Sequence, residues 1–445
     1  MNRRLYSLIV VPLVLLFAAA AIMTAGAGKP PPSGGGLAVA PIFSDNAVLQ
    51  RNMPVPVFGT ATSGTLVTVS FQGQNLSTTA GADGKWRVNL AAMPASTSPS
   101  TLTVTGGGTS KVFSNVQVGE VWVYSGQSNM HFALSSSVGG ADAVATAGNY
   151  NIRLYSTGAY GSAGWQISNS STAGSFSAVA FYMGRQLAIN LPGVPIGLIS
   201  QPVSGSLIIT WTHCLGGSRD GRNYDAQIKP LQPYAIRGVC WYQGEDDAHF
   251  GPEGYYTKLS GLIDEWRADW GQGAFPFYIV QLHWNGTAEG WPLIREDQLQ
   301  AYLQKTNIGL ATAVDLPPGG GHPPTKEPVG VRLALWARAL IYGETSLVYS
   351  GPIRSGATVS GNKVTVSFSF TGGGLTTNNG LAPGPFKIAG ADGVYHDATA
   401  TIVGNTVEVT SSVTVPKHIR YIWNYAQGNL CNTNGLPAVP FQLDL

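Results

Sequence analysis

The sequence predicts an α/β protein whose centre is a three-layer α/β/α domain with a parallel sheet, flanked by two β-sandwich-like regions. Between residues 116 and 343, continuously apolar runs alternate with helix-like stretches. On either side, short runs alternate apolar and polar residues between Gly, Ser and Thr turns, which is typical of small all-β units. With 445 residues, of which 44% are hydrophobic and 11% charged, the chain can bury more than one core.

Residues 1–27 are expected to form a secretory signal peptide. Two arginines precede an apolar run over 8–22, and an Ala-Gly-Ala triplet at 25–27 fits the small-residue cleavage pattern. Residues 28–36 are expected to be a linker. The alternative is an uncleaved membrane anchor, but the run is short for a span of about 20 residues. We therefore expect a secreted or extracytoplasmic protein with no stable membrane association after cleavage.

Two segments are expected to be all-β. Residues 37–115 are predicted to form an N-terminal β-sandwich domain, with runs such as "LVTVSFQG" and "GKWRVNL". Residues 344–445 are predicted to form a C-terminal β domain, with "GNKVTVSFSF" and "TIVGNTVEVTSS". Turn signals recur at intervals of roughly ten residues, which is the spacing expected of sandwich strands.

The middle segment, 116–343, is predicted to alternate strands and helices. The expected strands cover 120–124, 194–200, 236–241, 277–282 and 309–315. The expected helices cover 177–190, 255–270, 294–305 and 327–342. Continuously apolar strands between helices indicate a parallel sheet covered on both faces. Right-handed crossovers bring the carboxyl ends of the strands to one edge, where ligands bind in open α/β sheets.

Residues with the chemistry of acyl transfer follow these strand ends. Ser128 follows the first strand, Gly205 the second and Gln243 the third, while the fifth runs through "LPPGGGHPP" to His322. A serine hydroxyl becomes a nucleophile when a neighbouring base takes its proton, and an imidazole suits that role near neutral pH. The N–H groups of Ser128 and Gly205 and the side-chain amide of Gln243 are candidate donors to an oxyanion. Each residue alone reads as an ordinary cap, turn or loop residue, so the hypothesis depends on their convergence.

Composition argues against several other classes. The net charge is +2 and the chain has no Lys/Arg cluster beyond the two N-terminal arginines, so nucleic acid is not an expected partner. The three cysteines, Cys214, Cys240 and Cys431, cannot all pair within one chain. The seven histidines and the cysteines show no metal-ligand spacing. We expect no metal and no cofactor.

Several quoted segments resemble the sialate O-acetylesterase family, a carbohydrate-esterase branch of the SGNH hydrolases. They are "SGQSNM" (125–130), "WYQGE" (241–245), "HPPTKEPVGVRLA" (322–334), "IFSDNAVLQRNMPVPVFGTA" (42–61) and "REDQ" (295–298). The resemblance runs through nearly all of the expected mature chain. It implies a serine esterase that removes O-acetyl groups from sugars, foremost from O-acetylated sialic acids, by way of an acetyl-serine intermediate.

The same resemblance assigns roles residue by residue. Ser128 matches the nucleophile, His322 the base, and Gly205 and Gln243 the oxyanion-binding positions. The substrate pocket is expected to include Gln127, Asn129 and Glu245. Trp211 is added to it because it lies near the predicted edge, where an indole ring can stack on a sugar. Of the other tryptophans near the predicted edge, Trp284 and Trp291 are equally compatible with sugar stacking and with a core position, and Trp241 is expected in the core.

Two departures from the family pattern leave alternatives open. Many SGNH hydrolases carry an Asp three residues before the histidine, where this chain has Gly319. Asp315 is the first substitute, Glu245 and Asp246 are rivals, and a Ser–His dyad without an acid is a further alternative. The second block reads Ser-Gly-Ser at 204–206 instead of Gly-Gly-Thr. The alternative functions are therefore an esterase for acetylxylan or another polysaccharide, or a catalytically impaired glycan-binding homologue.

Overall fold

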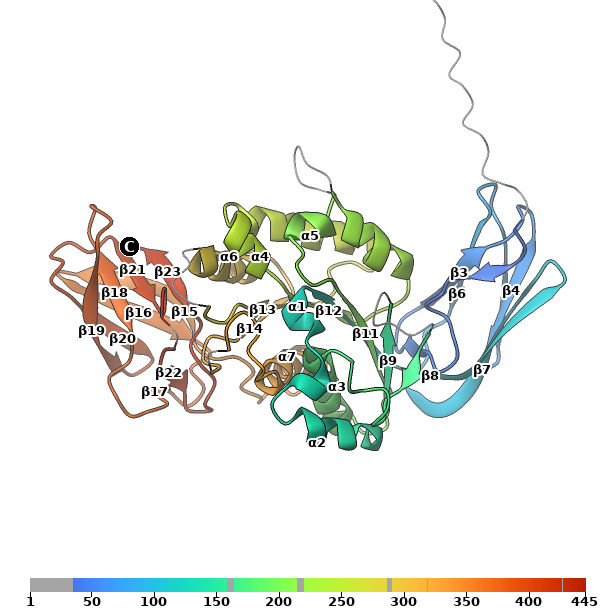
Figure 1. The fold of residues 1–445 in the computed structure, drawn as a ribbon, viewed down its shortest axis with the longest axis horizontal. Coiled ribbons are helices and arrows are strands. Elements are labelled where there is room, and N and C mark those ends of the chain that lie inside the picture. The colour runs from blue at the N-terminus through green and yellow to red at the C-terminus, as the bar shows by residue number, and fades with distance from the viewer. Residues whose placement is uncertain (1–34, 158–163, 214–219, 286–289, 318, 426) are drawn as a thin grey trace, which may run out of the picture.

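A computed structural model describes residues 35–157, 164–213, 220–285, 290–317, 319–425 and 427–445. Three parts follow one another along the long axis: a β region, a central α/β domain and a second β region (Figure 1). The expected signal peptide and nearly all of the expected linker lie outside the described residues. In the described ranges, no helix is both long enough and apolar enough to cross a membrane.

The N-terminal region consists of two small sheets. In the first, β3 (Val55–Thr60) lies between β1 (Ala38–Val39) and β6 (Lys85–Leu90). The second contains β4 (Leu66–Phe71), β5 (Gln74–Thr79), β7 (Ser96–Gly106) and the beginning of β8 (Thr109–Gly126). In β6, exposed and buried side chains alternate along the whole strand, as expected when one face of a sheet covers a core. The predicted sandwich packing of the two flanking regions stays a prediction.

The 18-residue strand β8 joins this region to the central domain. Its first half pairs antiparallel with β7, and its second half pairs parallel with β11 and β12. The predicted boundary at 115/116 therefore lies inside one continuous strand. At the junction, the buried carboxylate of Glu120 accepts hydrogen bonds from Arg51 at 2.6 Å and Arg237 at 2.8 Å. Because a buried charge is stable only when it is paired, this cluster fixes the two regions against each other.

The central sheet has the strand order β10-β9-β11-β8-β12-β13-β14. Its strands besides β8 are β9 (Ile152–Ser156), β10 (Gln166–Ile167), β11 (Ile196–Pro202), β12 (Gly238–Tyr242), β13 (Phe277–Gln281) and β14 (Ile308–Thr312). The five predicted strands are confirmed, and β9 and β10 are additional ones. Every residue of β12, β13 and β14 is buried, as expected for parallel strands covered on both faces. A short strand, β2 (Val48–Gln50), pairs parallel with β8.

Helices cover both faces of the central sheet (Figure 1). On one face, α3 (Ala178–Asn190) packs against α7 (Glu327–Leu340); on the other, α5 (Tyr255–Trp270) packs against α6 (Gly290–Gln304). All four predicted helices are confirmed. Shorter helices are α1 (Ser128–His131), α2 (Gly140–Ala145) and α4 (Glu245–Phe250). Because β8 is central and the chain extends from it in both directions, its carboxyl end is a topological switch point, where a cleft is expected.

The C-terminal region is a seven-stranded antiparallel sheet with a two-stranded ribbon. The sheet has the order β15 (Ile353–Ser360), β16 (Lys363–Ser369), β20 (Thr406–Thr410), β19 (Tyr395–Val403), β18 (Phe386–Ala389), β21 (His418–Tyr421) and β23 (Phe441–Asp444). The ribbon pairs β17 (Leu375–Thr377) with β22 (Leu430–Asn432). On α6, Glu296 bonds Arg354 at 2.8 Å and the Gln442 N–H at 2.8 Å. Part of the "REDQ" segment therefore attaches this sheet to the central domain.

Candidate active site

A sharp turn places Ser128 at the carboxyl end of β8. Gly126 has φ 129°, and a Cβ at this position would lie 2.1 Å from the carbonyl oxygen of Tyr242. Only glycine fits such a turn without displacing β12. The Gln127 N–H donates to the same carbonyl at 3.0 Å, and α1 begins at the next residue. Ser128 is thus held at the start of a short helix at the switch point.

The structure brings His322 to this serine across 194 residues of sequence. The Nε2 atom of His322 lies 2.7 Å from the Oγ atom of Ser128. Burial lowers the pKa of His322, the positive charge of Lys326 lowers it further, and the carboxylate of Asp246 opposes both effects. A lowered pKa leaves the imidazole neutral near pH 7, the form that accepts a proton from a hydroxyl.

The loop that carries His322 is held through its backbone carbonyls. The Gly320 carbonyl accepts a hydrogen bond from Nε2 of His283 at 3.0 Å, and the Gly321 carbonyl accepts one from the amide of Asn129 at 2.9 Å. Burial lowers the pKa of His283 to about 3, so this ring is neutral and carries its hydrogen on the atom that donates. Two buried donors therefore fix the residues immediately before the candidate base.

Beneath the serine, Asn129 joins two buried ionisable groups. Its amide nitrogen donates to Glu245 Oε1 at 2.6 Å, and its oxygen accepts from the ammonium group of Lys326. Lys326 is 1% exposed, and its nitrogen lies 4.9 Å from the centroid of the Phe132 ring. Burial raises the pKa of Glu245 to about 7 and lowers that of Lys326 to about 7. Gln127, the other predicted pocket residue here, is buried and bonds Asp246 at 2.9 Å.

The first candidate for a supporting acid, Asp315, is not positioned to support His322. Both of its carboxylate oxygens bind Arg332, at 2.7 and 2.6 Å. In the described part of the chain, the imidazole of His322 makes its one side-chain hydrogen bond to Ser128. An aspartate three residues before the histidine has no room either, because a Cβ at Gly319 would lie 2.7 Å from the Cα atom of Pro323. Asp246 is the carboxylate whose negative charge raises the pKa of His322.

Of the three predicted oxyanion donors, two remain available. Within the described ranges, the N–H groups of Ser128 and Gly205 make no hydrogen bond. Gly205 is exposed, with φ 68°, on the loop after β11. By contrast, the amide nitrogen of Gln243 already donates to the Ser206 carbonyl at 2.9 Å and to Asp247 at 2.6 Å. Gln243 is buried and has no spare amide hydrogen in this arrangement.

Trp211 is a core residue, contrary to its predicted place in the substrate pocket. Its side chain is fully buried, its indole N–H donates to Ser206 Oγ at 2.9 Å, and its ring packs edge-to-face on Trp241 with centroids 5.6 Å apart. Such a ring has no free face for a sugar. Trp291 is also buried, and Trp284 is half-buried. Trp241 is in the core, as predicted.

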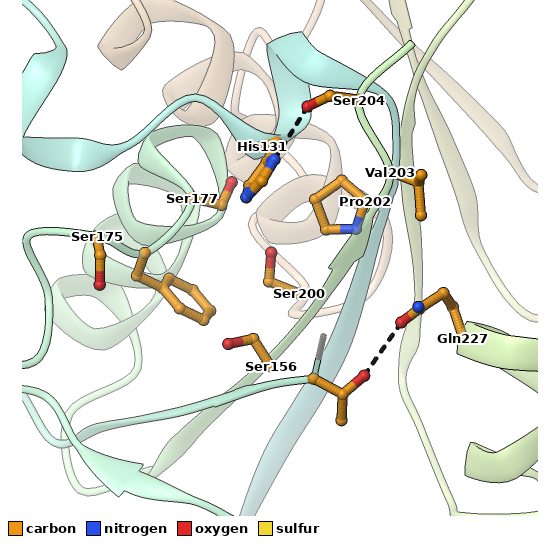
Figure 2. Close-up of a pocket in the computed structure, with 11 residues that line it drawn as sticks. His131, Ser156, Ser175, Ser177, Ser200, Pro202, Val203, Ser204 and Gln227 are labelled. Carbon is orange, nitrogen blue, oxygen red and sulfur yellow. Dashed lines mark hydrogen bonds between the residues drawn. The ribbon is translucent and has the colours of Figure 1, made fainter. Parts of the chain in front are cut away.

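A cavity of about 290 Å³ opens at the carboxyl ends of β9 and β11 (Figure 2). His131, one helical turn after Ser128, reaches its rim and bonds the hydroxyl of Ser204 at 3.0 Å. The remaining lining residues are Ser156, Thr157, Ser175, Phe176, Ser177, Ser200, Pro202, Val203 and Gln227.

In the ranges covered by the structure, no group of three His, Cys, Asp or Glu side chains is placed to hold a metal ion.

The fold and the Ser–His pair together are those of a carboxylic ester hydrolase. Residues 118–334 match the carbohydrate esterase family described as sialic acid-specific acetylesterase. The structure of a carbohydrate acetylesterase from Xanthomonas citri superposes with a TM-score of 0.84 and 36% identity, covering 92% of this chain and 99% of that one. The chain belongs to the carbohydrate acetylesterases.

Curated relatives in mammals are named sialate O-acetylesterase. The human protein is 29% identical over 296 residues, 54% of this chain. The rat protein is 28% identical over 413 residues, 72% of this chain and 76% of that protein. The match spans 56% of the length of the human relative.

Sequence reasoning missed two buried residues that build the site. Lys326 lies inside the quoted "HPPTK" segment but was assigned no role. His283 directly follows the predicted strand 277–282, so its place at a strand end was a signal for a site residue. The sequence does not show that the two side chains are buried, because only the fold places them next to the loop of His322.

Proposed function

We propose that the protein hydrolyses O-acetyl groups of carbohydrates through an acetyl-Ser128 intermediate. The observation that carries this proposal is the 2.7 Å contact between Ser128 Oγ and His322 Nε2 at the switch point of the sheet. The hydroxyl oxygen attacks the acetyl carbonyl carbon while His322 takes the hydroxyl proton. The N–H groups of Ser128 and Gly205 stabilise the oxyanion, and one such donor is typically worth about 3 kcal/mol.

The tetrahedral intermediate collapses when the bond between its carbon and the sugar oxygen breaks, and His322 returns its proton to that leaving oxygen, which leaves acetyl-Ser128. Water then attacks the acetyl carbon while His322 takes one water proton. The bond between that carbon and Ser128 Oγ breaks, Ser128 Oγ takes the proton from His322, and acetic acid leaves and ionises in solution. Asn129 and His283 act in this scheme by holding the loop of His322, and Glu245 and Lys326 by holding Asn129.

The acetylated substrate can belong to either of two classes of carbohydrate. O-acetylated sialic acids are the first, because the curated mammalian relatives carry that name. Acetylxylan or another neutral acetylated polysaccharide is the second, because no lysine or arginine is among the described residues that line the cavity. We also propose an extracytoplasmic location, which rests on the sequence of residues 1–27.

The test is acetate release from p-nitrophenyl acetate and from a panel of acetylated sugars. Ser128→Ala should lower kcat by at least about a thousandfold, the loss expected when a nucleophile is removed. Ser136→Ala, an exposed serine on the following segment, is the matched control and should retain full activity. Full activity in Ser128→Ala would refute the assignment.

A further inference from the structure

The cavity at the carboxyl ends of β9 and β11 is lined by hydroxyl groups that have no partner among the described residues. Ser156 and Ser200 are register partners on neighbouring parallel strands, so their side chains lie on the same face of the sheet. Their hydroxyls and that of Ser175 make no hydrogen bond within the described part of the chain, and Figure 2 shows all three around the cavity. A hydroxyl both donates and accepts hydrogen bonds, so each of these side chains can pair with a sugar hydroxyl in either direction.

The cavity also provides an apolar surface and a neutral amide. Phe176, 6% exposed, contributes an aromatic ring to the lining, and such rings pack against the C–H faces of sugars. The single hydroxyl hydrogen of Thr157 is shared between Gln201 Oε1 at 2.7 Å and Gln227 Oε1 at 3.1 Å. The amide nitrogen of Gln227 makes no hydrogen bond within the described part of the chain, so it can donate to a ligand. At about 290 Å³, the volume is near the lower end, about 300 Å³, of typical ligand pockets, so it suits one sugar ring.

Among the described lining residues, none carries a fixed charge. His131 is the one titratable residue among them, and burial lowers the pKa of this imidazole, which keeps it neutral near pH 7. A carboxylate gains most from charge-assisted bonds to Arg or Lys, and neither residue type occurs in the described lining of this cavity. A sialic acid would therefore place its carboxylate against neutral groups and gain no charge-assisted hydrogen bond from them. A neutral sugar has no carboxylate, so the neutral lining does not weaken its binding.

The cavity is also correctly placed relative to the nucleophile. Pro202 of β11 pairs with Gly126 of β8, so the turn that carries Ser128 is adjacent to the cavity rim. His131 extends from α1 to the same rim and binds Ser204, next to the candidate oxyanion donor Gly205. A sugar ring in the cavity can therefore direct a substituent toward Ser128.

We propose that this hydroxyl-lined cavity is a saccharide subsite that holds one neutral sugar ring and selects neutral acetylated sugars over acidic ones. The proposal rests on the esterase function proposed above and specifies its substrate class. It contrasts with the sialic acid named in the family description, and the contrast follows from the residues of this chain.

The first test removes the unpartnered hydroxyls. The Ser156→Ala/Ser200→Ala variant is assayed on an acetylated methyl glucoside and on p-nitrophenyl acetate, which has no sugar ring. The ratio of kcat/KM for the sugar ester to that for the phenyl ester should fall about tenfold, the loss of two ordinary hydrogen bonds. The matched control, Ser355→Ala/Ser360→Ala on exposed positions of β15, should leave the ratio unchanged. An unchanged ratio in the cavity variant would overturn the subsite.

The second test compares charge. Wild-type kcat/KM should be at least about tenfold higher for the acetylated glucoside than for an O-acetylated sialic acid, and Gln227→Arg should narrow that gap by supplying a cation. A wild-type preference for the sialic acid would overturn the proposal. Calorimetry of methyl glucoside binding to the Ser128→Ala variant separates the two proposals. If the sugar binds but the wild type hydrolyses no ester, the subsite is supported and the esterase function is refuted. If the sugar does not bind, the subsite is refuted.

Discussion

Replacing Asn129 with leucine tests whether the buried network beneath Ser128 holds the site together. Leucine has nearly the same shape but leaves Glu245 Oε1, the Gly321 carbonyl and the Lys326 ammonium without their partner. An unsatisfied buried polar group costs about 1–3 kcal/mol, so three groups cost about 3–9 kcal/mol. Since Glu245 and Lys326 each have a pKa of about 7, both can become neutral at little cost. We therefore expect Asn129→Leu to lower the free energy of unfolding by about 3 kcal/mol, the lower end of this range.

The same variant should also slow catalysis, because the Gly321 carbonyl is one of two anchors of the His322 loop. A displacement of about 1 Å in a reacting group lowers rates by up to about a hundredfold, so kcat for p-nitrophenyl acetate should fall about 10- to 100-fold with little change in KM. Urea unfolding gives the stability and steady-state kinetics gives kcat. The matched control is Asn405→Leu in the exposed β19–β20 turn, expected within about 0.5 kcal/mol of the wild type. If Asn129→Leu matched that control in both measurements, the role assigned to the network would be wrong.

Three further variants test the electrostatics and the missing acid. Lys326→Met removes a charge that lowers the pKa of His322, so the acid limb of the pH–kcat/KM profile should move to higher pH; an unmoved limb contradicts this. Asp315→Asn should lower stability by about 1–3 kcal/mol, because Arg332 loses its bidentate partner, yet keep kcat within about twofold. A hundredfold fall would show that Asp315 supports His322. Gly319→Asp should lower kcat, because its Cβ would overlap Pro323; a gain would show that the loop can accept a triad acid.

Much of the fold was predictable from local pattern. Period-two alternation identified strands such as β6 and β16, and continuous apolar runs identified the parallel strands of the central sheet. Helix α5 begins and ends at the predicted residues. The strand β9 was missed because its five residues include a buried arginine, Arg153, which lacks the apolar character expected of a core strand. The predicted boundary at 115/116 falls within β8, because this one strand pairs with β7 along its first half and with β11 and β12 along its second half.

The convergence of the site was also predictable, but its supporting contacts were not. Strand topology brings Ser128 and His322 to one edge, and the structure places them 2.7 Å apart. The prediction for Trp211 failed because its position near a strand end is compatible with either an exposed or a buried ring, and packing on Trp241 decides between them. The prediction for Asp315 failed because Arg332, one turn into α7, competes for the carboxylate.

The sequence by itself determined the class of the fold, the family, and the convergence of Ser128 and His322 at one edge of the sheet, because these depend on local periodicity and on short motifs at strand ends. Only the tertiary structure decided how the histidine is held. The carbonyls of Gly320 and Gly321 are bound by His283 and Asn129, which come from distant parts of the chain. Which buried donor reaches which carbonyl depends on packing between elements, and the sequence pattern within each element carries no information about it.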